Sequence, residues 1–168
     1  YVIGNPPYVS LYGRRDKKEN EEQRVNYLNN YHQFPSSVKN GKLNLVMLFI
    51  EHSLDFLKED GKLSFIIDVS FFETAYEFTR KYLLDNTTIV ELQVNIKDFD
   101  VASGQVIIKL SKTKCSNNKV QIIDHKTQNN YLVEQESWYN KNDEYKFRYN
   151  GCSISKQILD KVQEKKDK

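Results

Sequence analysis

Apolar residues recur at intervals of three and four over residues 43–57, which predicts an amphipathic helix packed on a sheet. The members of this stripe are Leu43, Val46, Met47, Ile50, Leu54 and Leu57. Gly61 follows the polar pair Glu59-Asp60, as a residue that ends a helix often does. The next apolar run, 63–67, is rich in β-forming residues and predicts a short strand covered on both faces.

The spacing of Ser70 and Glu73 is that of a capping box, which predicts a second helix from this point. Its apolar side would include Phe72, Ala75, Tyr76, Thr79, Tyr82 and Leu83. Two further strands are predicted at 89–94 and 106–110. They should pair antiparallel because the loop between them is too short for a crossover helix. This order of elements indicates an α/β protein whose mixed sheet carries helices on its faces and ends in an antiparallel strand pair.

Residues 9–41 are polar, charged and rich in tyrosine, with no apolar periodicity. A structureless loop of this length inside a compact domain is usually functional or disordered. Tyr12, Tyr27 and Tyr31 have two equally supported interpretations, as aromatics that face a ligand or as ordinary anchors of the loop. The role of the 9–42 loop therefore stays open at this point.

Polarity rises again after residue 113. Residues 120–123 would add an edge strand, and residues 154–162 have the pattern of a short amphipathic helix. We interpret 114–168 as an edge strand and a connector toward a further domain.

Bulk composition narrows the class of protein. A chain of 168 residues with net charge +2 fits one domain, and its charge alone does not indicate a nucleic-acid partner. No apolar run is long enough to span a bilayer and no export signal is visible, so we expect a cytoplasmic protein without a membrane partner. Cys115 and Cys152 lack metal-ligand or redox spacing, and the three histidines are scattered, so we assign no metal.

The candidate chemistry lies in the quartet Asn5-Pro6-Pro7-Tyr8, which follows an apolar strand at residues 1–3. Ligands of open α/β sheets bind beyond the carboxyl ends of strands. An aromatic amine such as that of adenine is a poor nucleophile, and two acceptors that hold both of its hydrogens free the lone pair. The side-chain carbonyl of Asn5 and the main-chain carbonyl of Pro6 can do this. The alternative is a rigid turn that merely ends the strand.

A base inside a duplex must be flipped out to reach such acceptors, and Tyr8 offers a face on which it can stack. With these residues the chain resembles the amino-group DNA methyltransferases, and among them the adenine-specific enzymes similar to the TaqI and Eco57I methylases. The other segments that carry the resemblance are Asn44–Glu51, Gly61–Ile67, Arg80–Leu84, Asp98–Phe99 and Val106–Leu110. Together they span about residues 1–112.

The resemblance implies a partial Rossmann-like methyltransferase fold. Residues 1–113 would be the second half of the catalytic domain, the half that holds the target base, and 114–168 would lead toward an absent DNA-specificity domain. It also implies a role for each residue of the site: Asn5 and Pro6 accept the amine hydrogens, Pro7 and Tyr8 bind the base, and Phe99 closes its other face.

The cofactor implied by the resemblance is S-adenosyl-L-methionine. The family binds it mainly through a Gly-containing loop that precedes the quartet, and the six glycines of this chain form no such loop. We therefore expect this chain alone to hold no complete cofactor site and to be inactive. We also expect the open sheet edge at residues 1–3 to favour self-association.

The implied function is methyl transfer to the N6 amine of adenine in DNA, within a restriction-modification or related DNA modification system that could include restriction or specificity components. The same quartet also occurs in enzymes that methylate RNA or protein glutamine, and N4-cytosine methylation uses a similar pocket, typically with Ser first. The Asn44–Glu51 segment and the Phe99 loop favour adenine in DNA. The alternative from a different functional class is a non-catalytic DNA-binding or interaction module that retains the fold.

Overall fold

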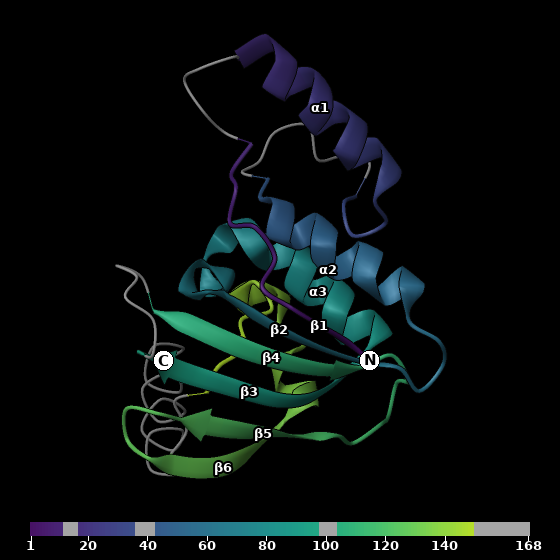
Figure 1. Cartoon of the computed structure of the whole chain (residues 1–168). Helices are drawn as coiled ribbons and strands as arrows, with labels where there is room; N and C mark the ends of the chain where they lie inside the picture. Colours follow the sequence, from purple (N-terminus) through teal and green to yellow (C-terminus); the bar gives the residue numbers. More distant parts are fainter. Residues whose placement is uncertain (12–16, 36–42, 98–103, 150–168) are drawn as a thin grey trace, which may run out of the picture.

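The structure is a computed structural model that describes residues 1–11, 17–35, 43–97 and 104–149, with the side chains of 17–20 left out. Its helices and strands are shown in Figure 1. They are β1 (Val2–Gly4), α1 (Lys17–Asn30), α2 (Leu45–Phe56), β2 (Lys62–Asp68), α3 (Glu77–Asn86), β3 (Thr88–Ile96), β4 (Gln105–Ser111), β5 (Lys119–Asp124) and β6 (Asn129–Glu134).

The described strands form a single mixed sheet in the order β1-β2-β4-β3-β5-β6. β1 lies parallel to β2, and β4 lies antiparallel to both β2 and β3, which confirms the antiparallel pair predicted from the short loop. The prediction of an edge strand at 120–123 is wrong: β5 pairs parallel with β3 on one side and antiparallel with β6 on the other. β6 therefore forms that edge of the sheet.

Buried residues alternate with more exposed ones along β2, β4 and β5, so one face of the sheet carries the core. α2 and α3 lie over this face (Figure 1) and share one hydrophobic cluster with it. We predicted that the strand at 63–67 is covered on both faces. In the part of the chain that the structure describes, Leu63 and Phe65 are buried on one face while Ser64 and Ile66 are half-buried on the other.

The helix predicted from the stripe at 43–57 is confirmed as α2. The Asn44 side chain caps its first turn by accepting from the Val46 amide at 3.0 Å. The helix ends at Phe56, several residues before Gly61, which serves the following turn instead. A Cβ atom at Gly61 would lie 2.7 Å from the main-chain oxygen of Lys58, so this turn leaves no room for a side chain.

The capping box predicted at Ser70 and Glu73 is wrong. The Asp68 side chain, at the end of β2, accepts from the Ser70 amide at 2.8 Å. This contact starts a 3-10 helix over Val69–Phe72, and a second follows over Thr74–Tyr76. α3 consequently begins only at Glu77.

The 9–41 segment contains a helix, α1, where the sequence predicted none. The two ends of this segment lie side by side. The Leu11 amide donates to the main-chain carbonyl of Leu43, and the Leu45 amide donates to that of Val9, each at 2.9 Å. In Figure 1, α1 lies farthest from the sheet, and its sequence is mostly polar. Within the described residues of this segment no further helix or strand appears.

Tyr27 and Tyr31 of this segment pack edge-on, with ring centroids 6.1 Å apart, and both border the hydrophobic core. This packing favours the interpretation as loop anchors over that as ligand-facing aromatics. Tyr12, the third candidate, lies outside the described residues.

A buried carboxylate ties the end of this segment to the core. Glu51 of α2 is only 1% exposed and accepts from the amides of His32 and Gln33, at 2.5 and 3.1 Å. The Gln33 side chain donates to Glu51 at 3.0 Å and accepts from the Thr79 hydroxyl of α3 at 2.5 Å. Residues 32–33 are thus held by both helices that cover the sheet.

Replacing Glu51 by Ala should lower the free energy of unfolding by about 2 to 3 kcal/mol, because buried donors lose a charged acceptor. Hydrogen exchange at the amides of His32 and Gln33 should accelerate more than exchange at the amides of the sheet. Asp55→Ala, at an exposed position one turn later in the same helix, is the matched control and should leave both measurements unchanged. Equal exchange in the two variants would refute the anchoring role.

The described part of the 114–168 segment packs into the same body as the rest. The rings of Trp138 and Phe147 stack with their centroids 4.4 Å apart. The Phe147 ring also packs edge-on against the Phe71 ring, with centroids 5.4 Å apart. Trp138 and Phe147 are each only 1% exposed. The helix predicted at 154–162 lies outside the described residues, and a connection toward a specificity domain stays a prediction.

Candidate functional site

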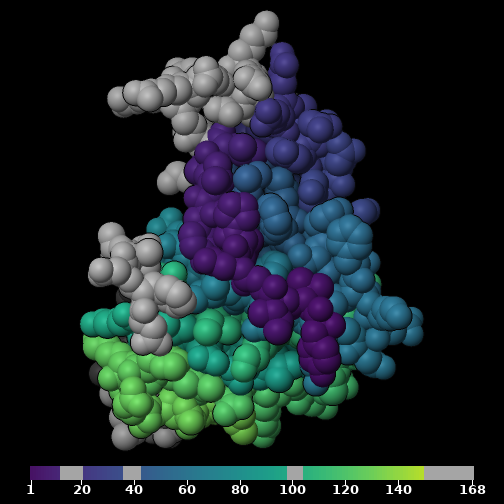
Figure 2. Space-filling model, viewed as in Figure 1, coloured from purple at the N-terminus to yellow at the C-terminus, as the bar shows by residue number. Residues whose placement is uncertain are grey.

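The quartet Asn5-Pro6-Pro7-Tyr8 directly follows β1. It lies at the carboxyl end of this strand, beside the carboxyl end of its parallel neighbour β2. Gly4 leaves room for the Phe65 ring of β2, since a Cβ atom at this position would lie 3.2 Å from that ring. Within the quartet only Pro6 is buried. Figure 2 shows the amino-terminal segment (purple) lying on the surface of the molecule, so the quartet is open to a large ligand.

Tyr8 turns its hydroxyl toward two oxygen atoms. The hydroxyl is 2.6 Å from Oδ1 of Asn5 and 2.9 Å from the main-chain oxygen of Ile66 in β2. Burial of the phenol, and then the nearby Asp68 carboxylate, raise the pKa of Tyr8 above its ordinary value. The phenol therefore stays protonated at neutral pH and can donate.

The structure thus brings Asn5 and Tyr8 together on one loop, with Pro6 and Pro7 between them. Phe99 lies outside the described residues, and its place in the site stays a prediction. The strands before and after it, β3 and β4, meet at this same end of the sheet. Gln105 at the start of β4 pairs with Ile96 at the end of β3 and with Asp68 at the end of β2.

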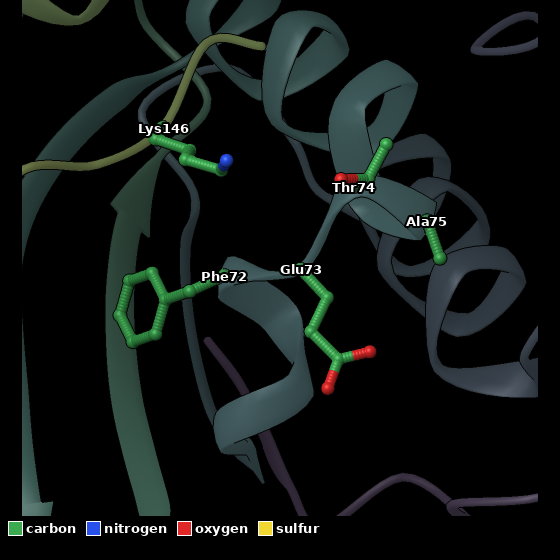
Figure 3. Close-up of a pocket in the computed structure, with 5 residues that line it drawn as sticks. All are labelled: Phe72, Glu73, Thr74, Ala75 and Lys146. Atoms are coloured by element: carbon green, nitrogen blue, oxygen red, sulfur yellow. The ribbon is translucent and has the colours of Figure 1, made fainter. Parts of the chain in front are cut away.

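A pocket of about 530 Å³ opens just beyond β2, and sequence reasoning missed it. Its lining residues are Phe72, Glu73, Thr74, Ala75 and Lys146 (Figure 3). Figure 3 shows Lys146 reaching toward the turn that carries Glu73 and Thr74. The Glu144 carboxylate holds this arrangement, since it binds Lys146 Nζ and accepts from the Thr74 hydroxyl, each at 2.9 Å. No local pattern joins residues seventy positions apart, so only the fold reveals the pocket.

The described residues contain three glycines that could contribute to a cofactor loop. Their three glycines lie apart, Gly4 beside the Phe65 ring, Gly61 in a tight turn and Gly104 before β4 with open space around it. These three glycines therefore form no shared glycine-rich loop. Over the same ranges, no cluster of three potential metal ligands appears, and no helix is long and apolar enough to cross a membrane.

The sequence model of the Eco57I restriction-modification methylases matches residues 1–102, which include β1, the quartet, α2, β2 and β3. The chain belongs to this family. This bears out the resemblance drawn from the quartet and the segments that follow it. Among curated proteins, none matches the chain.

Solved structures share the fold of this Eco57I-family chain at low sequence identity. A class I S-adenosylmethionine-dependent methyltransferase of Listeria monocytogenes is 20% identical with a TM-score of 0.52, over 73% of this chain and 35% of its own. The type IIG restriction endonuclease BpuSI is 15% identical with a TM-score of 0.62, over 89% and 20%. The type ISP restriction-modification enzyme LlaBIII, bound to DNA, is 19% identical with a TM-score of 0.53, over 73% and 10%.

These likenesses confirm the partial Rossmann-like methyltransferase fold that the resemblance implied. The Eco57I-family chain spans about a third or less of each neighbour's length. The activity, substrate and partners of a complete enzyme are therefore matters of proposal.

Proposed function

We propose that this chain is the target-base half of a methyltransferase that modifies the N6 amine of adenine in DNA within a restriction-modification system. The observation that carries the proposal is the placement of the Asn5-Pro6-Pro7-Tyr8 quartet at the carboxyl end of β1, beside the end of β2. Membership of the Eco57I family supports it.

In the proposed chemistry, two acceptors orient the N6 amine of the target adenine. The Asn5 side-chain carbonyl accepts one of its hydrogens and the main-chain carbonyl of Pro6 accepts the other, which directs the nitrogen lone pair away from the ring. S-adenosylmethionine supplies the methyl group. The Tyr8 ring supports a base flipped out of the duplex, a contact worth about 1 to 3 kcal/mol.

The exposure of the quartet supports a macromolecular substrate, because an extrahelical base must enter from a large duplex. RNA, protein glutamine and N4-cytosine remain rival substrates, since each presents a planar amine or amide to the same acceptors. Asn rather than Ser at position 5 favours adenine over cytosine N4. A non-catalytic DNA-binding module is the rival from another class.

Product analysis distinguishes these functions. The complete enzyme, with S-adenosylmethionine carrying a labelled methyl group, should label duplex DNA, and mass spectrometry of the nucleosides should find N6-methyladenine. Label in RNA, in cytosine or in a glutamine residue would refute the adenine assignment in favour of that rival. DNA binding without any methylated product would favour the non-catalytic module.

Phe99 is proposed as the second stacking aromatic, on the other face of the flipped base. Phe99→Ala in the complete enzyme should weaken productive binding of the flipped adenine by about 1 to 3 kcal/mol, the value of one stacking contact. Single-turnover kinetics over a range of DNA concentrations measures this loss. Phe56→Ala, which removes an exposed ring of α2, is the control, and unchanged turnover and affinity in Phe99→Ala would place the residue elsewhere.

A further inference from the structure

The hydroxyl of Tyr8 lies within hydrogen-bonding distance of two acceptors, Asn5 Oδ1 at 2.6 Å and the Ile66 carbonyl oxygen at 2.9 Å. A phenol carries one hydrogen and can donate to only one of these oxygens at a time. The other oxygen would then face the phenol oxygen without a hydrogen between them. All three groups can be hydrogen-bonded at once only if one of the two acceptors instead donates to the phenol oxygen.

Only the Asn5 group can change its role. The Ile66 carbonyl belongs to the backbone of β2 and can only accept. The Asn5 carboxamide has an oxygen and an NH2 group of almost the same shape, and half a turn about its terminal bond exchanges them. In the satisfied arrangement, the Asn5 NH2 group donates to the Tyr8 oxygen, and the Tyr8 hydroxyl donates to Ile66.

We propose that Tyr8 is a positioning residue, whose hydroxyl fixes the Asn5 carboxamide so that Oδ1 stays free for the target amine. This inference rests on the proposed function and gives Tyr8 a second task beside stacking. Each hydrogen bond in the chain from Asn5 through Tyr8 to Ile66 polarises the next, so the arrangement is stronger than two separate contacts.

The position of Ile66 suits this task. The pairing of β1 with β2 ends at Gly4 and Phe65, one residue before Ile66. The Tyr8 hydroxyl continues the connection between the two strands where the backbone pairing stops. A strand in the middle of a sheet is rigid, whereas Asn5 is exposed and its side chain would otherwise sample several rotamers. The contact therefore fixes the position of the Asn5 carboxamide relative to the rigid strand β2.

Tyr8→Phe tests the proposal, because phenylalanine keeps the aromatic face and removes only the hydroxyl. In the complete enzyme, acting on duplex DNA with its own site, the single-turnover rate of methyl transfer should fall about 5- to 10-fold, the effect of one hydrogen bond. The fluorescence of 2-aminopurine at the target position, which reports base flipping, should stay at the wild-type level. An unchanged rate would overturn the proposal.

The decisive measurement repeats Tyr8→Phe in an Asn5→Ala background. A hydroxyl that acts through Asn5 has nothing to position there, so its removal should cause no further loss of rate. The same 5- to 10-fold loss in both backgrounds would mean that the hydroxyl acts independently of Asn5, and would overturn the proposal. A wild-type enzyme that makes no N6-methyladenine would instead overturn the proposed function, so the two failures are distinguishable.

Tyr139→Phe is the matched control, because its hydroxyl also has two partners in another part of the fold: it donates to Asp85 Oδ1 at 2.8 Å and accepts from Lys114 Nζ at 3.3 Å. This variant should lower the melting temperature and leave the rate per folded molecule unchanged. Rates of all variants are expressed per folded molecule, determined by circular dichroism. An equal loss of rate in Tyr139→Phe would assign the Tyr8 effect to stability and overturn the proposal.

Discussion

Replacing Asn5 by Ala in the complete enzyme should lower the rate of methyl transfer by about 10²-fold or more, the loss typical of one preorganised polar group at a reacting centre. The contact of Oδ1 with the amine hydrogen strengthens as the lone pair turns toward the methyl group. It therefore belongs to the transition state, and its loss should appear in the turnover number. Cofactor affinity should change little, because Asn5 acts on the base.

Two further substitutions at this position sharpen the test. Asn5→Asp keeps an acceptor and should retain part of the rate, whereas Asn5→Leu has a similar size without an acceptor and should be as slow as Asn5→Ala. Single-turnover methylation is measured beside thermal unfolding. Asn86→Ala, which removes an exposed carboxamide at the end of α3, is the control and should keep the wild-type rate. If the quartet is only a strand-ending turn, Asn5→Ala will cost stability and spare the rate per folded molecule.

Most of the sheet and its covering helix could be predicted because their signal is local. α2 shows the apolar period of a buried helix, and β2, β3 and β4 are short apolar runs bounded by polar residues. The antiparallel pairing of β3 with β4 also followed from loop length alone. β5 was placed at the edge because its parallel partner, β3, lies more than twenty residues away and no local pattern reports that pairing.

The other misses have physical causes. α1 is mostly polar, and its apolar residues are too few to show a helical period. The start of α3 was misplaced because the Asp68 side chain captures the Ser70 amide and diverts the chain into 3-10 turns. No sequence pattern indicates that Trp138 and Phe147 meet, and only the folded chain stacks one ring on the other.

At the site, sequence chemistry identified Asn5 as an acceptor and Tyr8 as an aromatic face. It did not reveal that the Tyr8 hydroxyl contacts Asn5, because the contact depends on side-chain rotamers. Nor did it reveal Ile66, whose contribution is a main-chain carbonyl and independent of its side chain. Positioning groups of this kind become visible only when the strand order is known.

Replacing Arg80 by Met should lower the free energy of unfolding by about 3 to 5 kcal/mol, because several main-chain carbonyls lose a buried, charged donor. Arg80 is fully buried in α3. Its guanidinium donates to the main-chain carbonyls of Phe71 and Glu73, at 2.6 and 2.8 Å, and to those of Glu144 and Tyr145, at 2.8 and 3.2 Å. These carbonyls cannot be removed by mutation. Met would take this donor from all four, and of them the Glu73 carbonyl also accepts from the Tyr76 amide, at 3.1 Å.

The second pair of carbonyls explains why the effect should be large. Glu144 and Tyr145 both adopt positive φ angles, of 54° and 52°, which non-glycine residues rarely do in succession. The planar fork of Arg80 holds this strained turn against the turn that follows β2. Burial lowers the pKa of Arg80 to about 10, while the carboxylate of Glu144 opposes that shift, so the group stays charged at neutral pH and its hydrogen bonds are charge-assisted.

Urea unfolding of the 168-residue chain measures the loss. Arg80→Lys should be intermediate, because an ammonium keeps the charge but cannot span both turns with a planar fork. Arg148→Met is the control: Arg148 pairs with Asp143 at the surface, and such exposed pairs contribute about 0 to 1 kcal/mol. Equal urea midpoints for Arg80→Met and Arg148→Met would show that the two turns hold together without Arg80. The expected order, with Arg80→Met lowest, Arg80→Lys next and Arg148→Met near wild type, would identify the buried guanidinium as the link between the family region and the carboxyl-terminal segment.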